Sequence, residues 1–275
     1  MFKKNEEKIL SEHDDTPNEF LMTRRTAMLG ALGVMFMPVS ALLKPAMAQS
    51  ATQAAAGVAE TLKNIPGMCR VATAAVEGPY YIDKEIFRSD IREDQPGVPL
   101  ELELRLVNSN ASCTPIKGAV ISIWHCNAQG RYSGYLFNDP NKIPDMATVN
   151  EFGHVIHKDT ERFLRGAQTT DEEGKVTFKT IVPGWYTPRA VHIHVRAFLN
   201  EHTMITTQLY FPQALLNAIQ STEPAYKSRG VSIYTNEDDV VRAQSGISGL
   251  TDILSIKSGD NGVLKASMTL GVGSV

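Results

Sequence analysis

The feature that most constrains the fold is a series of short β-rich runs separated by turn residues. Residues 100–107, LELELRLV, alternate strictly between apolar and charged side chains, the pattern of a strand with one buried face. Many short strands with turns between them predict an all-β fold, a β-sandwich of short mixed strands with long active-site loops. Further β-rich runs lie at 118–124, 175–182, 190–199, 206–211 and 262–272.

Two segments depart from this pattern. Residues 212–221, PQALLNAIQS, have the look of a helix. Residues 136–166 form a long irregular segment, and loops of this length inside compact domains are commonly functional. We therefore expect segment 136–166 to help shape a binding pocket.

The first 48 residues have the pattern of an export signal that is removed from the mature protein. Arg24 and Arg25 precede an apolar run over 27–43, and residues 46–48, Ala-Met-Ala, have the small-x-small form of a cleavage site. The paired arginines predict that twin-arginine machinery exports the folded chain to the periplasm or the extracellular space. The alternative is an uncleaved membrane anchor, although the run is short for a span of ~20 residues.

The remainder is predicted to be a linker over 49–66 and a single domain over 67–275. The chain carries 27 Lys and Arg against 30 Asp and Glu, a formal net charge of −3. This charge gives no electrostatic reason to expect a nucleic-acid partner.

Three cysteines lie in the predicted domain, and an odd number in an exported protein suggests one disulfide and one spare thiol. Cys126 lies in an apolar stretch where a small thiol packs well. Cys69 and Cys113 lie in irregular segments, so we expect them to form the disulfide. Three free thiols are the alternative, because spacing alone does not fix connectivity.

The segment PGWYTPRAVHIHV, residues 183–195, places two histidines in an apolar run. On a strand, His192 and His194 point to the same face, ~7 Å apart at ~3.3 Å per residue, and can converge on one ion. Two histidines at this spacing are not specific by themselves, and a hydrogen-bonded pair facing solvent is the alternative.

Four motifs in one order make the chain similar to the intradiol ring-cleavage dioxygenases that act on catechol and protocatechuate, in their exported single-domain form. The motifs are EGPYY (77–81), IWHCNAQGRYSGY (123–135), the run from FLRG to HIHV (163–195), and TTQLYF (206–211). The resemblance implies one iron(III) ion per chain, held by Tyr132, Tyr186, His192 and His194. Hard iron(III) suits anionic phenolate donors, which a bound metal deprotonates.

The resemblance also implies the reaction. An aromatic vicinal diol binds the iron, and O2 cleaves the ring between the two hydroxyl-bearing carbons to give a cis,cis-muconate-type diacid. Tyr186 then serves as ligand and base. Arg189 stabilises the negative charge that develops on the substrate, and Gln208 positions substrate or intermediate.

Several other residues are candidates for the substrate pocket, which we expect Pro79, Tyr80 and Arg131 to line. Arg131 or Arg165 is a candidate partner for a substrate carboxylate, whereas Tyr135 competes with Tyr132 for the ligand role on spacing alone. His154 and His157 are expected either to be solvated or to lie at the pocket edge. The sequence leaves open which diol is the substrate and whether the chain forms a homo-oligomer.

A different class of function is an exported β-sandwich that binds carbohydrate or protein without catalysis, because a fold alone does not decide function. In that case the aromatic residues would form a stacking platform and the histidines would have no shared role. The complete quartet together with Arg189 favours the enzyme.

Overall fold

The computed structural model describes residues 69–143, 149–246 and 252–273. The predicted export signal (1–48) and linker (49–66) lie outside the described residues. Within the described part, no helix is long and apolar enough to cross a membrane.

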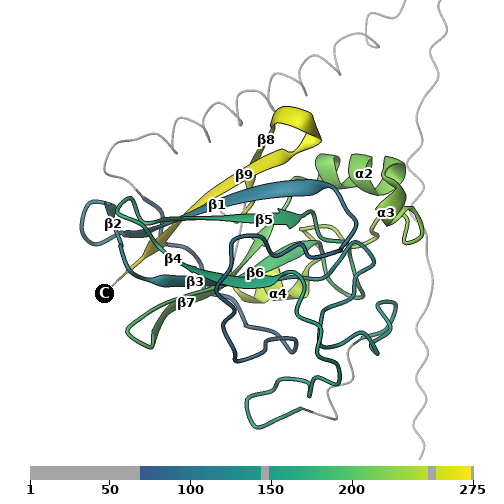
Figure 1. The fold of residues 1–275 in the computed structure, drawn as a ribbon, viewed down its shortest axis with the longest axis horizontal. Coiled ribbons are helices and arrows are strands. Elements are labelled where there is room, and N and C mark those ends of the chain that lie inside the picture. Colours follow the sequence, from purple (N-terminus) through teal and green to yellow (C-terminus); the bar gives the residue numbers. More distant parts are fainter. Residues whose placement is uncertain (1–68, 144–148, 247–251, 274–275) are drawn as a thin grey trace, which may run out of the picture. The chain divides into compact units, whose positions relative to one another are not determined.

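Two sheets form the domain, as the strand pattern predicted (Figure 1). The first is built around β1 (Pro99–Asn108), which pairs in parallel with β9 (Leu264–Val272) and antiparallel with β5 (Lys175–Ile181). The short strands β2 (Thr114–Pro115) and β8 (Ser255–Ser258) pair with β1 and β9. The fold is therefore an all-β sandwich with mixed strand directions.

The second sheet has the order β4-β3-β6-β7, and all its pairs are antiparallel. Its strands are β4 (Arg165–Thr169), β3 (Val120–Trp124), β6 (His192–Leu199) and β7 (His202–Tyr210). Within the described ranges, three helices follow or flank the strands: α2 (Gln213–Thr222), α3 (Pro224–Lys227) and α4 (Val240–Gln244). A short 3-10 helix, η3 (Asp260–Gly262), precedes β9.

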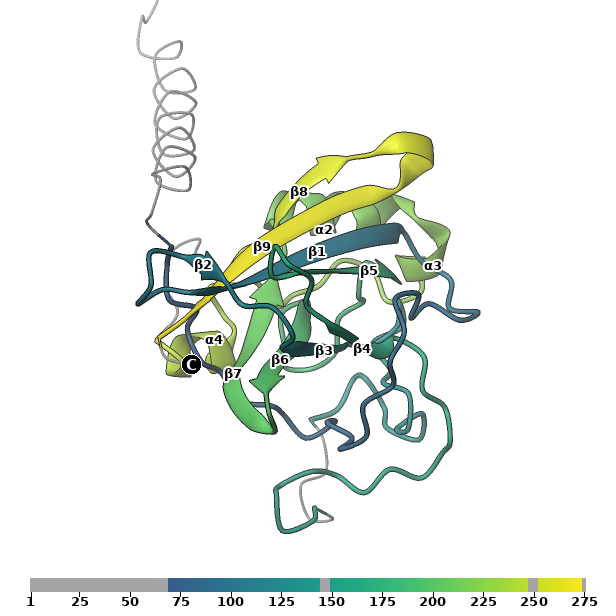
Figure 2. The same cartoon turned by 60° about the vertical axis from the view of Figure 1, so that its left-hand side comes forward.

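The main core fills the space between the two sheets. The alternating leucines of β1 and Phe178 of β5 are fully buried there with Ile121, Ile193 and Val195 of the second sheet. Because neighbouring residues on a strand point to opposite faces, His192 and His194 point away from this core. Figure 2 shows loops gathered on that outer side of β3 and β6.

Cys69 and Cys113, the two cysteines expected to pair, form a disulfide with their Cα atoms 5.6 Å apart. The bond joins the start of the described chain to the turn between β1 and β2. Cys126 is a free and buried thiol. Its side chain donates to the carbonyl oxygen of Gly184.

His125, at the end of β3, joins the two sheets through a buried polar contact. Its Nε2 lies 2.7 Å from Oγ1 of Thr180 on β5, and its Nδ1 lies 2.8 Å from the Cys126 carbonyl oxygen. A carbonyl only accepts, so Nδ1 carries the hydrogen of a neutral imidazole and Nε2 accepts from Thr180. Burial lowers the pKa of His125 from 6.5 to about 4.

This shift predicts a pH dependence of stability. As pH falls, His125 takes up a proton near its ordinary pKa in the unfolded chain, and only at lower pH in the folded chain. The stabilisation is therefore fully present above pH 6.5 and is lost as pH falls toward the folded pKa of about 4. The loss of stability from this residue reaches at most about 3 kcal/mol.

Urea unfolding between pH 7 and pH 4 should show that the free energy of unfolding depends less on pH in His125→Gln than in the wild type. His202→Gln, on the exposed hairpin, is the control, and an equal flattening in both variants would contradict the assignment.

Candidate metal centre and active site

Four side chains from three parts of the chain meet on the outer face of the second sheet. His192 and His194 come from β6, Tyr132 from the loop after β3, and Tyr186 from the segment between β5 and β6. The Tyr186 hydroxyl lies 3.3 Å from Nε2 of His192, which lies 3.0 Å from Nε2 of His194. The rings of Tyr132 and Tyr186 are 5.6 Å apart. The structure thus brings together the four residues that the sequence resemblance selected.

Strand register fixes the two histidines. His194 lies opposite Trp124 of β3 on one side and Gln208 of β7 on the other, and His192 lies opposite Tyr210. The Trp124 ring stacks on the His194 ring with centroids 4.9 Å apart and an interplanar angle of 7°. The sheet therefore sets the imidazoles rigidly.

Close backbone packing positions the two tyrosines. Gly130, with φ of +78°, lies against the Trp185 carbonyl, and a Cβ at this position would overlap that oxygen. A Cβ at Gly184 would likewise overlap the Ala128 carbonyl. The turn before Tyr132 and the segment before Tyr186 touch because both glycines lack side chains.

Glycine is also needed in the EGPYY motif. Gly78 has φ of +80°, and a Cβ there would lie 3.0 Å from Cε1 of His194. This part of the motif therefore packs directly on a proposed ligand.

The hydrogen bonds of the imidazoles leave lone pairs in the site. Nδ1 of His192 donates to the Ala190 carbonyl at 2.7 Å, so Nε2 of the neutral ring carries the lone pair. His194 Nδ1 is buried and has no hydrogen-bond partner among the described residues. If Nδ1 carries the His194 proton, two lone pairs face one another at 3.0 Å, an arrangement that a cation would stabilise.

Burial governs the ionisation of the quartet. Exposed fractions are 2% for Tyr132, His192 and His194 and 6% for Tyr186. Burial lowers the pKa of both histidines well below the usual value, and it raises the pKa of Tyr186 to about 12 and that of Tyr132 higher than usual. Without a cation, all four groups are therefore neutral.

These donors fit iron(III). The Tyr132 hydroxyl is buried and has no hydrogen-bond partner among the described residues, so a ligand in the site would satisfy it. No cluster of three or more His, Cys, Asp or Glu in that part of the chain could hold a metal. The candidate centre depends instead on phenolic oxygens, which a hard, highly charged cation favours.

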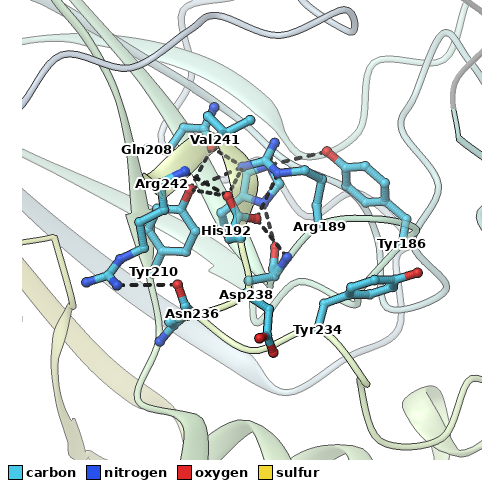
Figure 3. Close-up of polar contacts among 12 residues, drawn as sticks. Tyr186, Arg189, His192, Gln208, Tyr210, Tyr234, Asn236, Asp238, Val241 and Arg242 are labelled. Atoms are coloured by element: carbon cyan, nitrogen blue, oxygen red, sulfur yellow. Dashed lines mark hydrogen bonds and ion pairs between the residues drawn. The ribbon is translucent and has the colours of Figure 1, made fainter. Parts of the chain in front are cut away.

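Arg189 is buried beside Tyr186 and His192 of the quartet (Figure 3), and its Nη1 lies 3.4 Å from Nε2 of His192. It is paired with Asp239 rather than exposed at the surface, at 2.8 Å between Nε and Oδ2. Although burial opposes its charge, neighbouring Tyr186 and Asp239 raise the pKa of Arg189, so the guanidinium stays protonated.

Gln208 is fully buried on β7 and joins the same network. Its Oε1 accepts from Nη2 of Arg189 at 2.5 Å and from the Tyr210 hydroxyl at 3.1 Å. Its amide nitrogen donates to the Val76 carbonyl at 2.9 Å, next to the EGPYY motif.

Sequence reasoning missed Asp239 and Tyr210, which complete the surroundings of Arg189. Asp239 begins α4 as its N-cap, and an aspartate before an apolar pair is a recognisable helix-start signal. That signal predicts the helix but not a partner 50 residues away.

Two of the three residues predicted to line the substrate pocket, Tyr80 and Arg131, lie next to the quartet. Tyr80 and Arg131 line a small cavity beside Tyr132 and Tyr186, with a volume of about 10 Å³, room for about one water. A ligand larger than water can enter this cavity only if side chains such as Tyr80 move. Arg131 also holds the long loop, because its Nη1 donates to the carbonyls of Leu136 and Asn138.

Pro79 does not line this cavity, and its carbonyl accepts from Val155 of the long loop. Arg165 is buried and donates to the hydroxyl and carbonyl oxygens of Ser133, so its role here is structural. Its hydrogen bonds make it a poor candidate for a substrate carboxylate.

The remaining candidates lie around the quartet without joining it. The Tyr135 hydroxyl donates to the Tyr81 carbonyl, and no contact joins this hydroxyl to His192 or His194 among the described residues. His154 and His157 line a second cavity, of about 860 Å³. There His154 lies 3.0 Å from Glu77.

Comparisons with known proteins agree with this picture. Residues 76–246 match the family model described as Dioxygenase. A chlorocatechol 1,2-dioxygenase from Rhodococcus opacus is 27% identical over 166 residues, 50% of this chain and 56% of the relative. A catechol 1,2-dioxygenase from Candida albicans is 22% identical over 203 residues, 66% of this chain and 57% of the relative. The chain thus spans little more than half the length of these relatives.

A solved structure matches a larger share. An intradiol ring-cleavage dioxygenase from Tetranychus urticae is 33% identical, with a TM-score of 0.66. The match covers 75% of this chain and 96% of that chain.

The packing of the two tyrosine segments predicts the effect of one methyl group. Gly130→Ala should lower the free energy of unfolding by about 2 kcal/mol more than Gly118→Ala, measured by urea denaturation. Both glycines have φ of +78°, so both variants bear the same backbone cost, but only the Gly130 methyl meets Trp185. Equal losses in the two variants would show that the segments are not held by this contact.

Proposed function

This chain belongs to the intradiol ring-cleavage dioxygenase family, and we propose that it is an iron(III) enzyme that cleaves a catechol-type diol. The ring would open between the two hydroxyl-bearing carbons with O2, giving a cis,cis-muconate-type diacid. The observation that carries the proposal is the convergence of two buried phenols and two buried imidazoles beside a buried guanidinium.

Tyr132, Tyr186, His192 and His194 would hold one iron(III) ion per chain. Bound there, iron(III) would act as a Lewis acid toward both diol oxygens and make the ring reactive toward O2. The neutral imidazoles offer lone pairs without adding charge, and the two phenolates offset part of the +3 charge.

Tyr186 would also move a proton. Burial raises its pKa to about 12, so its phenolate oxygen is a strong base when no cation stabilises it. That oxygen would receive a proton from a diol hydroxyl. Its neighbours His192 and Arg189 would orient the protonated phenol.

Arg189 would supply a fixed positive charge where negative charge develops on the substrate ring, and Gln208 would hold that guanidinium in place. The site excludes most water, and in such surroundings a fixed charge acts more strongly than in solvent.

Relatives of this chain are named for catechol and chlorocatechol, which supports a small aromatic diol as the substrate class. Export of the chain remains part of the proposal, and the Cys69–Cys113 disulfide supports an oxidising compartment. The binding-module alternative needs exposed aromatic rings, whereas Tyr80, Tyr132 and Tyr186 are all buried.

The first test is a visible absorption spectrum of the purified, iron-loaded protein, before and after anaerobic addition of catechol. We expect a tyrosinate-to-iron(III) charge-transfer band that moves to longer wavelength with catechol. Tyr186→Phe and Tyr132→Phe should each alter this band, and Tyr135→Phe, the control, should not. A protein that stays colourless after iron loading would contradict the proposal.

The histidines are tested separately by iron retention. His192→Ala and His194→Ala should each lose most of the bound iron after dialysis, measured by elemental analysis, because each removes one of four donors. His157→Ala, which lines the larger cavity, is the control and should retain iron. Full occupancy in either ligand variant would remove that histidine from the proposed set.

A further inference from the structure

Asp239 is fully buried, and five donor groups lie within hydrogen-bond distance of its two oxygens. Oδ2 accepts from Nε of Arg189 at 2.8 Å and from the Ala190 amide at 2.9 Å. Oδ1 accepts from Nη2 of Arg189 at 3.1 Å and from the Arg242 amide at 2.9 Å. It also lies 3.2 Å from the Tyr210 hydroxyl, whose single hydrogen it shares with Gln208. Its two oxygens therefore bind the guanidinium through two separate nitrogens, the geometry that best fixes an arginine side chain.

This pairing determines which edge of Arg189 faces the site. Nε is bound by Asp239, and Nη2 is shared among Asp239, Gln208 and Tyr210. Nη1 is the nitrogen that points toward the quartet, at 3.4 Å from Nε2 of His192. A planar guanidinium held at two of its nitrogens cannot rotate the third away.

Helix α4 and its contacts hold Asp239 in place on the side away from Arg189. Asp239 is the N-cap of α4, and the next turn of that helix carries Arg242. Arg242 forms a second buried ion pair with Asp252, at 2.7 Å between Nε and Oδ2. The backbone carbonyl of Asp252 in turn accepts a hydrogen bond from the Tyr210 amide at 2.9 Å. Two ion pairs thus join α4 to β7 and to the segment that carries Arg189.

We propose that Asp239 is a positioning residue that acts through Arg189, holding the guanidinium so that Nη1 faces the bound diol. The inference rests on the proposed function, because it assigns Arg189 its role in ring cleavage. Asp239 touches neither the quartet nor the site of the diol in this reading. Its two hydrogen bonds to Arg189 are therefore the route by which we expect it to act on turnover.

The test compares two isosteric changes in the iron-loaded protein, Asp239→Asn and Asp252→Asn. Each removes one charge from a buried ion pair, and both should lower the urea concentration at the unfolding midpoint. Asp239→Asn should lower kcat by about 100-fold, since small displacements of catalytic groups have effects of that size. Asp252→Asn leaves both contacts between Asp239 and Arg189 in place and should lower kcat far less. The anaerobic affinity for catechol and the iron content should stay close to wild type in both variants.

A double variant separates positioning from a general loss of structure. In an Arg189→Ala background, Asp239→Asn should cause no further loss of kcat, because the group through which Asp239 acts is already gone. The same double variant should regain stability over Arg189→Ala alone, which leaves a buried carboxylate unpaired.

Asp239→Glu keeps the charge but lengthens the side chain. It is the variant to measure if Asp239→Asn does not fold. It should also lower kcat, because the guanidinium is displaced. Unchanged kcat in Asp239→Asn or Asp239→Glu, or an equal loss in Asp252→Asn, would overturn the proposal. A wild-type protein without the charge-transfer band or turnover would refute the proposed function instead, so the two failures are distinguishable.

Discussion

The outer face of the β4-β3-β6-β7 sheet buries two imidazoles and two phenols where little water can reach them, and this burial sets the conditions for the whole site. Neutral groups in such a place leave polar atoms without partners, as Tyr132 Oη and His194 Nδ1 are among the described residues. Such atoms have a free-energy cost unless something binds them. A hard cation bound by the two phenolates and the two Nε2 lone pairs would remove this cost at Tyr132 Oη. It would leave His194 Nδ1 as it is, because a ring that binds a cation through Nε2 keeps its hydrogen on Nδ1.

The sheet and the loops contribute to the site in different ways. Hydrogen-bonded register holds the histidines, with Trp124 and Gln208 on the neighbouring strands opposite His194. The tyrosines lie in irregular segments, which gain precision from backbone contacts at Gly130 and Gly184. A side chain held by a sheet has little conformational freedom. A side chain on a loop can exchange its contacts without disturbing the hydrogen bonds between strands. Histidines held by the sheet and tyrosines held by loops suit a centre in which the imidazoles stay in place while one phenol gains and loses a proton.

Much of this could be predicted from the sequence, for physical reasons that differ by element. The alternation in residues 100–107 predicted β1 and its buried face, because a strand with one buried side must alternate. β4, with the sequence RGAQT, and β8, with SIKS, carry no such pattern and were missed. Their strand conformation comes from pairing with β3 and β9 rather than from their own residues. Likewise, the distant ion pair between Arg189 and Asp239 has no local signature.

The two phenols are not equivalent, and their surroundings favour Tyr186 as the one that handles protons. The Tyr132 ring is enclosed by Tyr80 at 4.7 Å, and Arg165 lies 5.9 Å from it. Its hydroxyl has no hydrogen bond of ordinary geometry among the described residues, and Tyr186 is the neighbouring phenol that acts on it. The Tyr186 hydroxyl lies 3.3 Å from His192, and the charge of Arg189 acts to lower its pKa against the larger effect of burial. A phenol with these neighbours can leave a cation without becoming an unsatisfied buried group. Because Asp239 fixes Arg189, the electrostatic surroundings of that proton depend on α4, a helix that contributes no ligand.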